Sequence, residues 1–153
     1  AVVDVADRQA VEDWADMVVA DHGKVNLIVN NAGVALGANV DTMSYDDLEW
    51  LMGVNFWGVV HGTKAFLPHL RDSGEGHIVN VSSVFGLVGI PSQAAEKVFM
   101  TSPEKAAEVI LDGVARNKRR VFIGPDAQVF KVMSLLPPAV YQNLIRLGAK
   151  VGM

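Results

Sequence analysis

The sequence contains no cysteine, which excludes both a disulfide framework and a metal site built on thiolates. An excess of positive charge is also lacking, because the net charge of −4 gives no basic surface for nucleic acid. Polar residues, glycine and proline interrupt the longest uncharged stretch, residues 78–95, whereas a membrane-spanning helix needs about 20 mostly apolar residues. The four histidines lack the spacing of metal ligands. These absences predict a cytoplasmic protein without a metal or a membrane span.

The remaining composition is that of one globular domain, since half of the 153 residues are hydrophobic and 20% are charged. Sequence pattern predicts strands at residues 1–4, 25–29, 77–81 and 120–123. Periodicity and capping signals predict helices at residues 8–22, 44–71 and 102–117, followed by two apolar helical segments on either side of Pro137-Pro138. Strands that alternate with helices of ten or more residues indicate an α/β fold with a doubly wound parallel sheet.

Three polar motifs stand out, two of them after predicted strands and one inside a predicted helix. Asn30-Asn31-Ala32-Gly33 directly follows a strand, where small residues let a ligand approach the backbone and an asparagine side chain can tie the strand end to its neighbour. Asn55 lies inside a predicted helix, a position that asparagine disfavours without a specific reason. Ser83 follows the strand at 77–81. Asn55 and Ser83 come 25 and 53 residues after Asn30, and this spacing is the most specific signal in the chain.

Together with Val54-Asn55-Phe56-Trp57-Gly58 and the stretch from Ser83 to Ala95, this spacing resembles the short-chain dehydrogenase/reductase family. The resemblance covers nearly all of residues 1–95 and is weaker over residues 102–153. It implies a partial Rossmann-type sheet with flanking helices, NAD or NADP as cofactor, and interconversion of an alcohol and a carbonyl by hydride transfer. It also implies a small, apolar substrate and a homodimer or homotetramer.

The same resemblance assigns roles to single residues. Ser83 would orient the substrate oxygen, and Asn55 would hold a helix irregularity and a water that relays protons. The residues implied to bind the cofactor at its adenosine end are Asp4, Val5, Asn31, Ala32 and Gly33. Two simpler interpretations stay open: Asp4 as the cap of the helix that begins near Arg8, and Asn55 as a tolerated helical asparagine.

The family's proton donor is missing. Its tyrosine follows the catalytic serine by thirteen residues, and that position holds Glu96. A lysine should follow the tyrosine by four residues, but Tyr45 and Tyr141 are followed there by glutamate and isoleucine. No glycine-rich turn between a strand and a helix is present to cradle a pyrophosphate. We therefore expect the chain as it stands to be inactive.

Two explanations account for these gaps: either the sequence is only part of a longer polypeptide, with one missing segment between Ala95 and Glu96, or the gene encodes a truncated relative. We favour the first, because the junction interrupts an otherwise intact motif. The predicted organisation is a single incomplete dinucleotide-binding domain, residues 1–153, with core strands and active-site loop in 1–95 and a variable C-terminal part in 96–153. The alternative functions are a non-catalytic binding or interaction module and, third, a lipid-facing protein that uses its apolar tail.

Overall fold

The computed structural model describes residues 1–83 and 101–151, which belong to two compact units, residues 1–81 and 82–153. The junction between Ala95 and Glu96 lies outside the described residues, so the predicted discontinuity stays a prediction. The single-domain organisation predicted above also stays a prediction.

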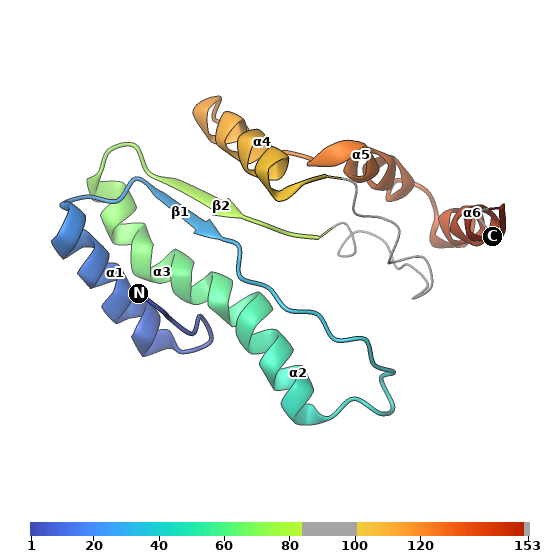
Figure 1. Cartoon of the computed structure of the whole chain (residues 1–153), viewed down its shortest axis with the longest axis horizontal. Helices are drawn as coiled ribbons and strands as arrows, with labels where there is room; N and C mark the ends of the chain where they lie inside the picture. Colours follow the sequence, from blue (N-terminus) through green and yellow to red (C-terminus); the bar gives the residue numbers. More distant parts are fainter. Residues whose placement is uncertain (84–100, 152–153) are drawn as a thin grey trace. The chain divides into compact units, whose positions relative to one another are not determined.

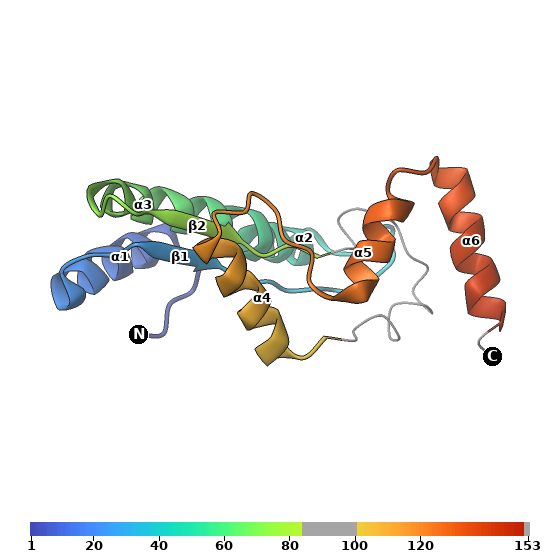
Figure 2. The same ribbon diagram turned by 90° about the horizontal axis from the view of Figure 1, so that it is seen from above.

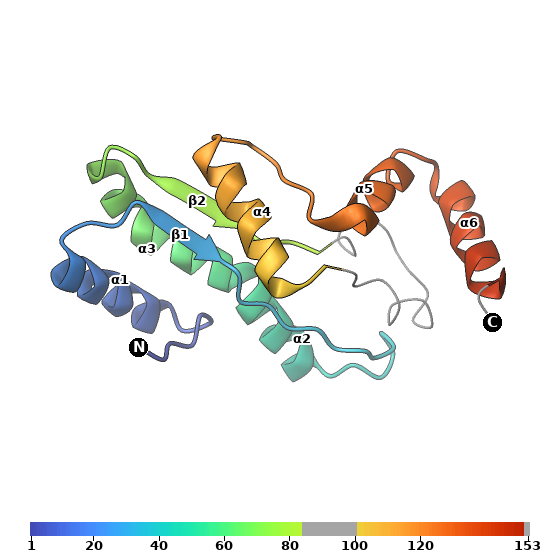
Figure 3. The same cartoon turned by 45° about the horizontal axis from the view of Figure 1, so that its top comes forward.

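The first unit is built around two parallel strands, β1 (Leu27–Asn30) and β2 (His77–Asn80). They run side by side in the same direction, with Leu27 opposite His77 and Asn30 opposite Asn80 (Figure 3). A long helical segment connects them, and it consists of α2 (Tyr45–Met52), η1 (Gly53–Trp57) and α3 (Gly58–Asp72) (Figure 1). This strand–helix–strand connection is the unit from which a doubly wound α/β sheet is made, as predicted.

The helix ends follow the capping signals in the sequence. Helix α1 (Arg8–His22) begins at Asp7, whose Oδ1 accepts the Ala10 N–H at 3.1 Å, and it ends at Gly23 with φ of 79°. A capping box opens α2, because the Ser44 Oγ accepts the Asp47 N–H and the Asp47 carboxylate accepts the Ser44 N–H. Both helix starts were predicted.

The sequence predicted one helix over residues 44–71, whereas the structure inserts a π-helical turn at η1. The Gly58 N–H donates to the Gly53 carbonyl, five residues earlier, and α3 then continues past Pro68 to Asp72. A π turn adds one residue to the helical repeat and is frequent at functional sites. Asn55 lies at the centre of this turn.

The core of the first unit lies between α1, α3 and β1. Its buried side chains are Ala15, Val25, Ile28, Phe66 and Leu70. The ring of Trp14 meets that of Phe66 edge to face, with the centroids 4.9 Å apart. This cluster packs α1 and α3 against the face of β1 that carries Ile28.

Two predicted strands are absent. Residues 1–4 and 120–123 have extended or irregular backbone but belong to no sheet, because in the described part of the chain only β1 and β2 pair with each other. A strand exists only where a neighbour accepts its hydrogen bonds, and sequence pattern cannot supply that neighbour. Directly after residues 120–123, Gly124-Pro125 begins a helix, with Gly124 at φ of 87° and Pro125 in the first turn.

The second unit contains three helices within its described residues: α4 (Pro103–Ala115), α5 (Gly124–Met133) and α6 (Pro138–Val151). The Ser102 Oγ caps α4 by accepting the Lys105 N–H at 3.3 Å, as the sequence predicted. A short turn at the two prolines separates α5 from α6 (Figure 2), again as predicted. Of the helices that the structure describes, none has both the length and the apolar character needed to cross a membrane.

Candidate functional site

The carboxyl ends of β1 and β2 are tied together by the side chain of Asn30. Its Nδ2 donates to Asn80 Oδ1 at 2.8 Å and to Thr63 Oγ1 of α3 at 3.2 Å. The expectation that an asparagine ties the strand end to its neighbour is therefore confirmed. Gly62 is buried against the same amide, and a side chain there would collide with Asn30 Oδ1.

Asn55 holds the segment that follows β1. Its Oδ1 accepts the Val34 N–H at 2.9 Å, and its Nδ2 donates to the Val34 carbonyl at 2.9 Å. This pair of hydrogen bonds brings Gly33 against the π turn, where a Cβ on Gly33 would lie 3.4 Å from Asn55 Oδ1. The structure therefore brings Asn55 and Gly33 together, and it gives the helical asparagine a specific partner.

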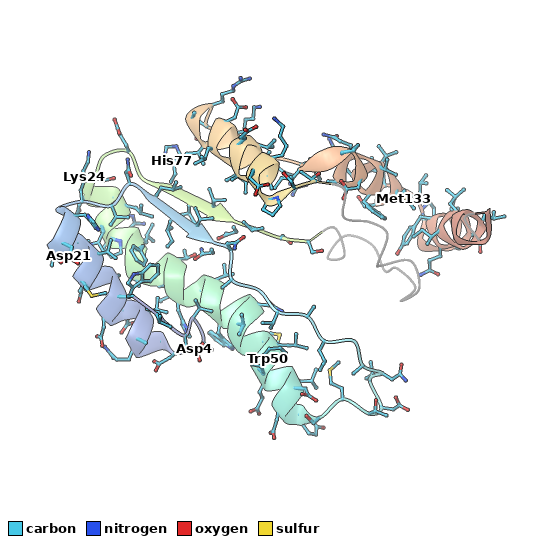
Figure 4. All side chains as sticks on the ribbon, in the orientation of Figure 1. Asp4, Asp21, Lys24, Trp50, His77 and Met133 are labelled. Carbon is cyan, nitrogen blue, oxygen red and sulfur yellow. The ribbon has the colours of Figure 1, made fainter. Side chains whose placement is uncertain are left out.

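Asp4 and Val5 form a turn before α1. The Asp4 Oδ1 accepts the Ala6 N–H at 2.9 Å, and the Asp4 carbonyl accepts the Asp7 N–H at 3.1 Å. Asp4 is exposed, and Figure 4 shows it beside the long helical segment. The alternative that Asp4 caps α1 is wrong, because Asp7 does so. The Val5 carbonyl accepts from His61 Nδ1 at 3.1 Å, so this turn is attached to α3.

One stretch of helix, from η1 into α3, therefore holds three segments of the chain. His61 donates to the Val5 carbonyl, the Thr63 hydroxyl accepts from the Asn30 side chain, and the Asn55 side chain binds the Val34 backbone. Asn31, Ala32 and Gly33 are exposed, so their backbone is open to a ligand. The arrangement offers an exposed carboxylate and short side chains beyond the carboxyl ends of parallel strands, where α/β sheets bind ligands.

His61 and Thr63 were not identified from the sequence as site residues. The signal that could have found them is the glycine pair at 58 and 62 within a predicted helix, since glycine there marks a close approach of another backbone. The Cβ that Gly58 lacks would be 2.8 Å from Val5 Cγ2.

Ser83 belongs to the second unit and follows the end of β2 by three residues. Its role in orienting the substrate oxygen stays a prediction. Tyr45, at the first turn of α2, is 84% exposed, and Tyr141 lies in α6.

A depression lies at the opposite, amino end of β2. It is lined by Leu67, Leu70, Arg71, Gly74, Gly76 and Ile78, and none of the predicted site residues is among them. It is therefore no extension of the candidate site. Within the described ranges, His, Asp and Glu form no group of three that could hold a metal ion.

The comparison with known proteins agrees with the motifs. Residues 1–97, well over half of the chain, match the family model of the short chain dehydrogenases. The chain belongs to the short-chain dehydrogenase/reductase family.

Two solved structures that this short-chain dehydrogenase/reductase resembles contain a bound cofactor. A family member from Burkholderia phymatum in complex with NAD is 42% identical with a TM-score of 0.56 and matches 59% of this chain and 32% of its own. A gluconate 5-dehydrogenase from Burkholderia cenocepacia J2315, in complex with NADP and tartrate, is 36% identical with a TM-score of 0.57 and matches 60% of this chain and 36% of its own.

SadH of Mycobacterium tuberculosis H37Rv, named as an oxidoreductase, is 34% identical to this short-chain dehydrogenase/reductase. The alignment spans 206 residues and covers 95% of this chain and 75% of SadH. The aligned 95% of this chain amounts to about 145 residues. Roughly 60 of the 206 aligned positions of SadH are therefore opposite a gap in this chain. The alignment thus spans three quarters of this relative, whereas the chain matches only about a third of each of the two solved structures.

Proposed function

We propose that the intact protein is an NAD- or NADP-dependent oxidoreductase that interconverts an alcohol and a carbonyl by hydride transfer. The observation that carries the proposal is the pair of hydrogen bonds between Asn55 and Val34, which presents Gly33 at the π turn. The substrate is a small, apolar alcohol or ketone, and the active form is a homodimer or homotetramer in the cytoplasm.

The residues present fit the adenosine end of such a cofactor. The exposed Asp4 carboxylate has acceptor capacity beyond its bond to the Ala6 N–H, so it can accept from the adenine amino group beside the Val5 backbone. The exposed Asn31, Ala32 and Gly33 are small or short enough to let the adenosine approach the chain. Held there by Asp4, Val5 and residues 31–33, the cofactor would supply the hydride donor or acceptor for the substrate carbon.

The remaining chemistry is proton transfer at the substrate oxygen. Reduction leaves an alkoxide that must gain a proton, and oxidation must remove one. Ser83 orients this oxygen by a hydrogen bond, and Asn55 holds a water that relays the proton. Neither residue is an acid or base at neutral pH, and positioned acid/base catalysis is worth about 10²–10⁴-fold. A further residue must supply this function.

We propose that this residue belongs to a segment missing between Ala95 and Glu96. The roughly 60 unmatched positions in the SadH alignment support this segment and its placement inside the chain. A tyrosine with a lysine four residues later is the expected content. A two-stranded parallel sheet is also small for a stable fold, since such sheets are normally covered on both faces and have more strands.

The mass of the natural protein tests directly whether the missing segment exists. A mass well above the 16.4 kDa of this chain, with a peptide linking Ala95 to new sequence, is expected. A mass of 16.4 kDa for the natural protein would contradict the existence of the missing segment, and it would favour the alternative function as a non-catalytic binding or interaction module.

Activity is tested by following the absorbance of the reduced nicotinamide with a panel of alcohols and ketones. Residues 1–153 alone should show background rates, and the longer protein should turn over at about 1 per second or faster. In the active protein, Ser83→Ala should lower kcat by about 10²-fold or more, because one hydrogen bond to the reacting oxygen is lost. Turnover by residues 1–153 would show that another residue replaces the tyrosine, and Glu96 would be the first to change.

A further inference from the structure

His61 lies on α3 and connects two parts of the first unit that are 56 residues apart in sequence. Its Nδ1 is 3.1 Å from the Val5 carbonyl oxygen, in a partly buried position. A carbonyl oxygen can only accept, so Nδ1 must carry the proton and donate. The tautomer of His61 is therefore fixed by its partner whenever the ring is neutral.

The ring of His61 is held in place from a second side. Trp57, one helical turn earlier, stacks on it with the centroids 6.1 Å apart and an angle of 25° between the planes. Gly58 leaves room for the Val5 side chain on the same part of the helix. The helix thus provides both the space for Val5 and the donor that fixes its carbonyl.

The other hydrogen bonds of this turn are local. They join Ala6 to the Asp4 side chain and Asp7 to the Asp4 carbonyl. In the described part of the chain, the bond from His61 is the one that attaches residues 4–6 to another element. Without it, Asp4 would keep its turn, and residues 4–6 would be held on the helix by the packing of Val5 at Gly58 and of Ala6 at Gly53, with no hydrogen bond to fix the Val5 carbonyl.

We propose that His61 is a positioning residue that holds Asp4 and Val5 in place for the adenine end of the cofactor. This inference rests on the proposed function. A segment that is fixed before binding loses less conformational entropy when the ligand arrives, so the effect falls on affinity for the adenosine half. The rate of hydride transfer at the far end of the cofactor should not change.

The test compares variants of the full-length protein. His61→Phe keeps a ring beside Trp57 and removes the donor, whereas His61→Asn retains an N–H close to the position of Nδ1. His69→Phe is the matched control, because His69 is on the same helix and has its own neighbour, Asp16, at 3.7 Å. Adenosine monophosphate and nicotinamide mononucleotide serve as separate competitive inhibitors, and unfolding midpoints in urea are measured alongside.

In His61→Phe we expect the KM for the dinucleotide and the inhibition constant of adenosine monophosphate to rise about five- to tenfold, as loss of one hydrogen bond allows. The kcat and the inhibition by nicotinamide mononucleotide should stay unchanged. His61→Asn should restore affinity to within about twofold of the wild type, and His69→Phe should resemble the wild type.

Equal affinity of His61→Phe and wild type for adenosine monophosphate would overturn the positioning role and leave the proposed function standing. A fall in kcat with unchanged KM, or weaker binding that tracks a lower unfolding midpoint in both His61→Phe and His61→Asn, would also overturn it. A wild-type protein that binds neither NAD nor NADP would overturn the proposed function and this inference with it.

Discussion

Replacing Gly62 by alanine tests how closely α3 must approach the end of β1. Gly62 is buried, and the new Cβ would collide with Asn30 Oδ1 and lie 3.5 Å from Asn30 Cγ. The amide of Asn30 cannot turn away freely, because its Nδ2 donates to Asn80 at 2.8 Å and to Thr63 at 3.2 Å. Either the helix must shift or these hydrogen bonds must break.

The magnitude follows from opposing terms. Overpacking a buried site costs about 1–3 kcal/mol, and each weakened hydrogen bond costs about 0.5–1.5 kcal/mol. Alanine is the better helix former by about 1 kcal/mol. The free energy of unfolding of Gly62→Ala should therefore fall by about 1–3 kcal/mol, since the steric and hydrogen-bond costs exceed the gain in helix propensity.

Urea unfolding followed by tryptophan fluorescence measures this change, and an unchanged slope would show that the midpoint reports stability. In an Asn30→Ala background the colliding amide is gone, so Gly62→Ala should there raise stability by about 0.5–1 kcal/mol. Gly37→Ala is the control, because no atom lies within 4 Å of its added Cβ. The reasoning fails if Gly62→Ala stabilises the wild-type background, or if it has the same effect in both backgrounds.

Two further predictions concern the π turn and the start of α4. Asn55→Asp keeps the acceptor for the Val34 N–H but places a carboxylate oxygen beside the Val34 carbonyl, so it should lower the free energy of unfolding at neutral pH by about 1–3 kcal/mol; urea unfolding equal to that of wild type would contradict the contact. Hydrogen bonds from its own backbone N–H and then from the Ser102 side chain lower the pKa of Glu104 below 4.5. The ionised carboxylate therefore stabilises α4 above the pKa of the unfolded chain, and this contribution is lost as the pH falls through the lower folded value. A carboxyl titration by NMR should give a midpoint below 4.5 that rises in Ser102→Ala, and a midpoint unchanged by that substitution would refute the role of Ser102.

The helices were predictable because their signals are local. Asp7 and Gly23 bound α1, Ser44 with Asp47 opens α2, and Ser102 opens α4, each through contacts within a few residues. The strand ends at Asn30 and Asn80 were likewise located to within one residue. Strands at 1–4 and 120–123 were wrong because an extended segment becomes a strand only through a distant partner.

The sequence by itself determined the family, through the spacing of Asn30, Asn55 and Ser83, and it revealed the missing tyrosine at Glu96. The pairing of Asn55 with Val34 and of His61 with Val5 depended on the tertiary structure. These contacts join residues 21 and 56 positions apart, and they exist because α3 packs on both β1 and α1 and brings the segments together. Local propensity contains no information about such distant partners. A helix that packs one face against several chain segments determines all of these contacts together.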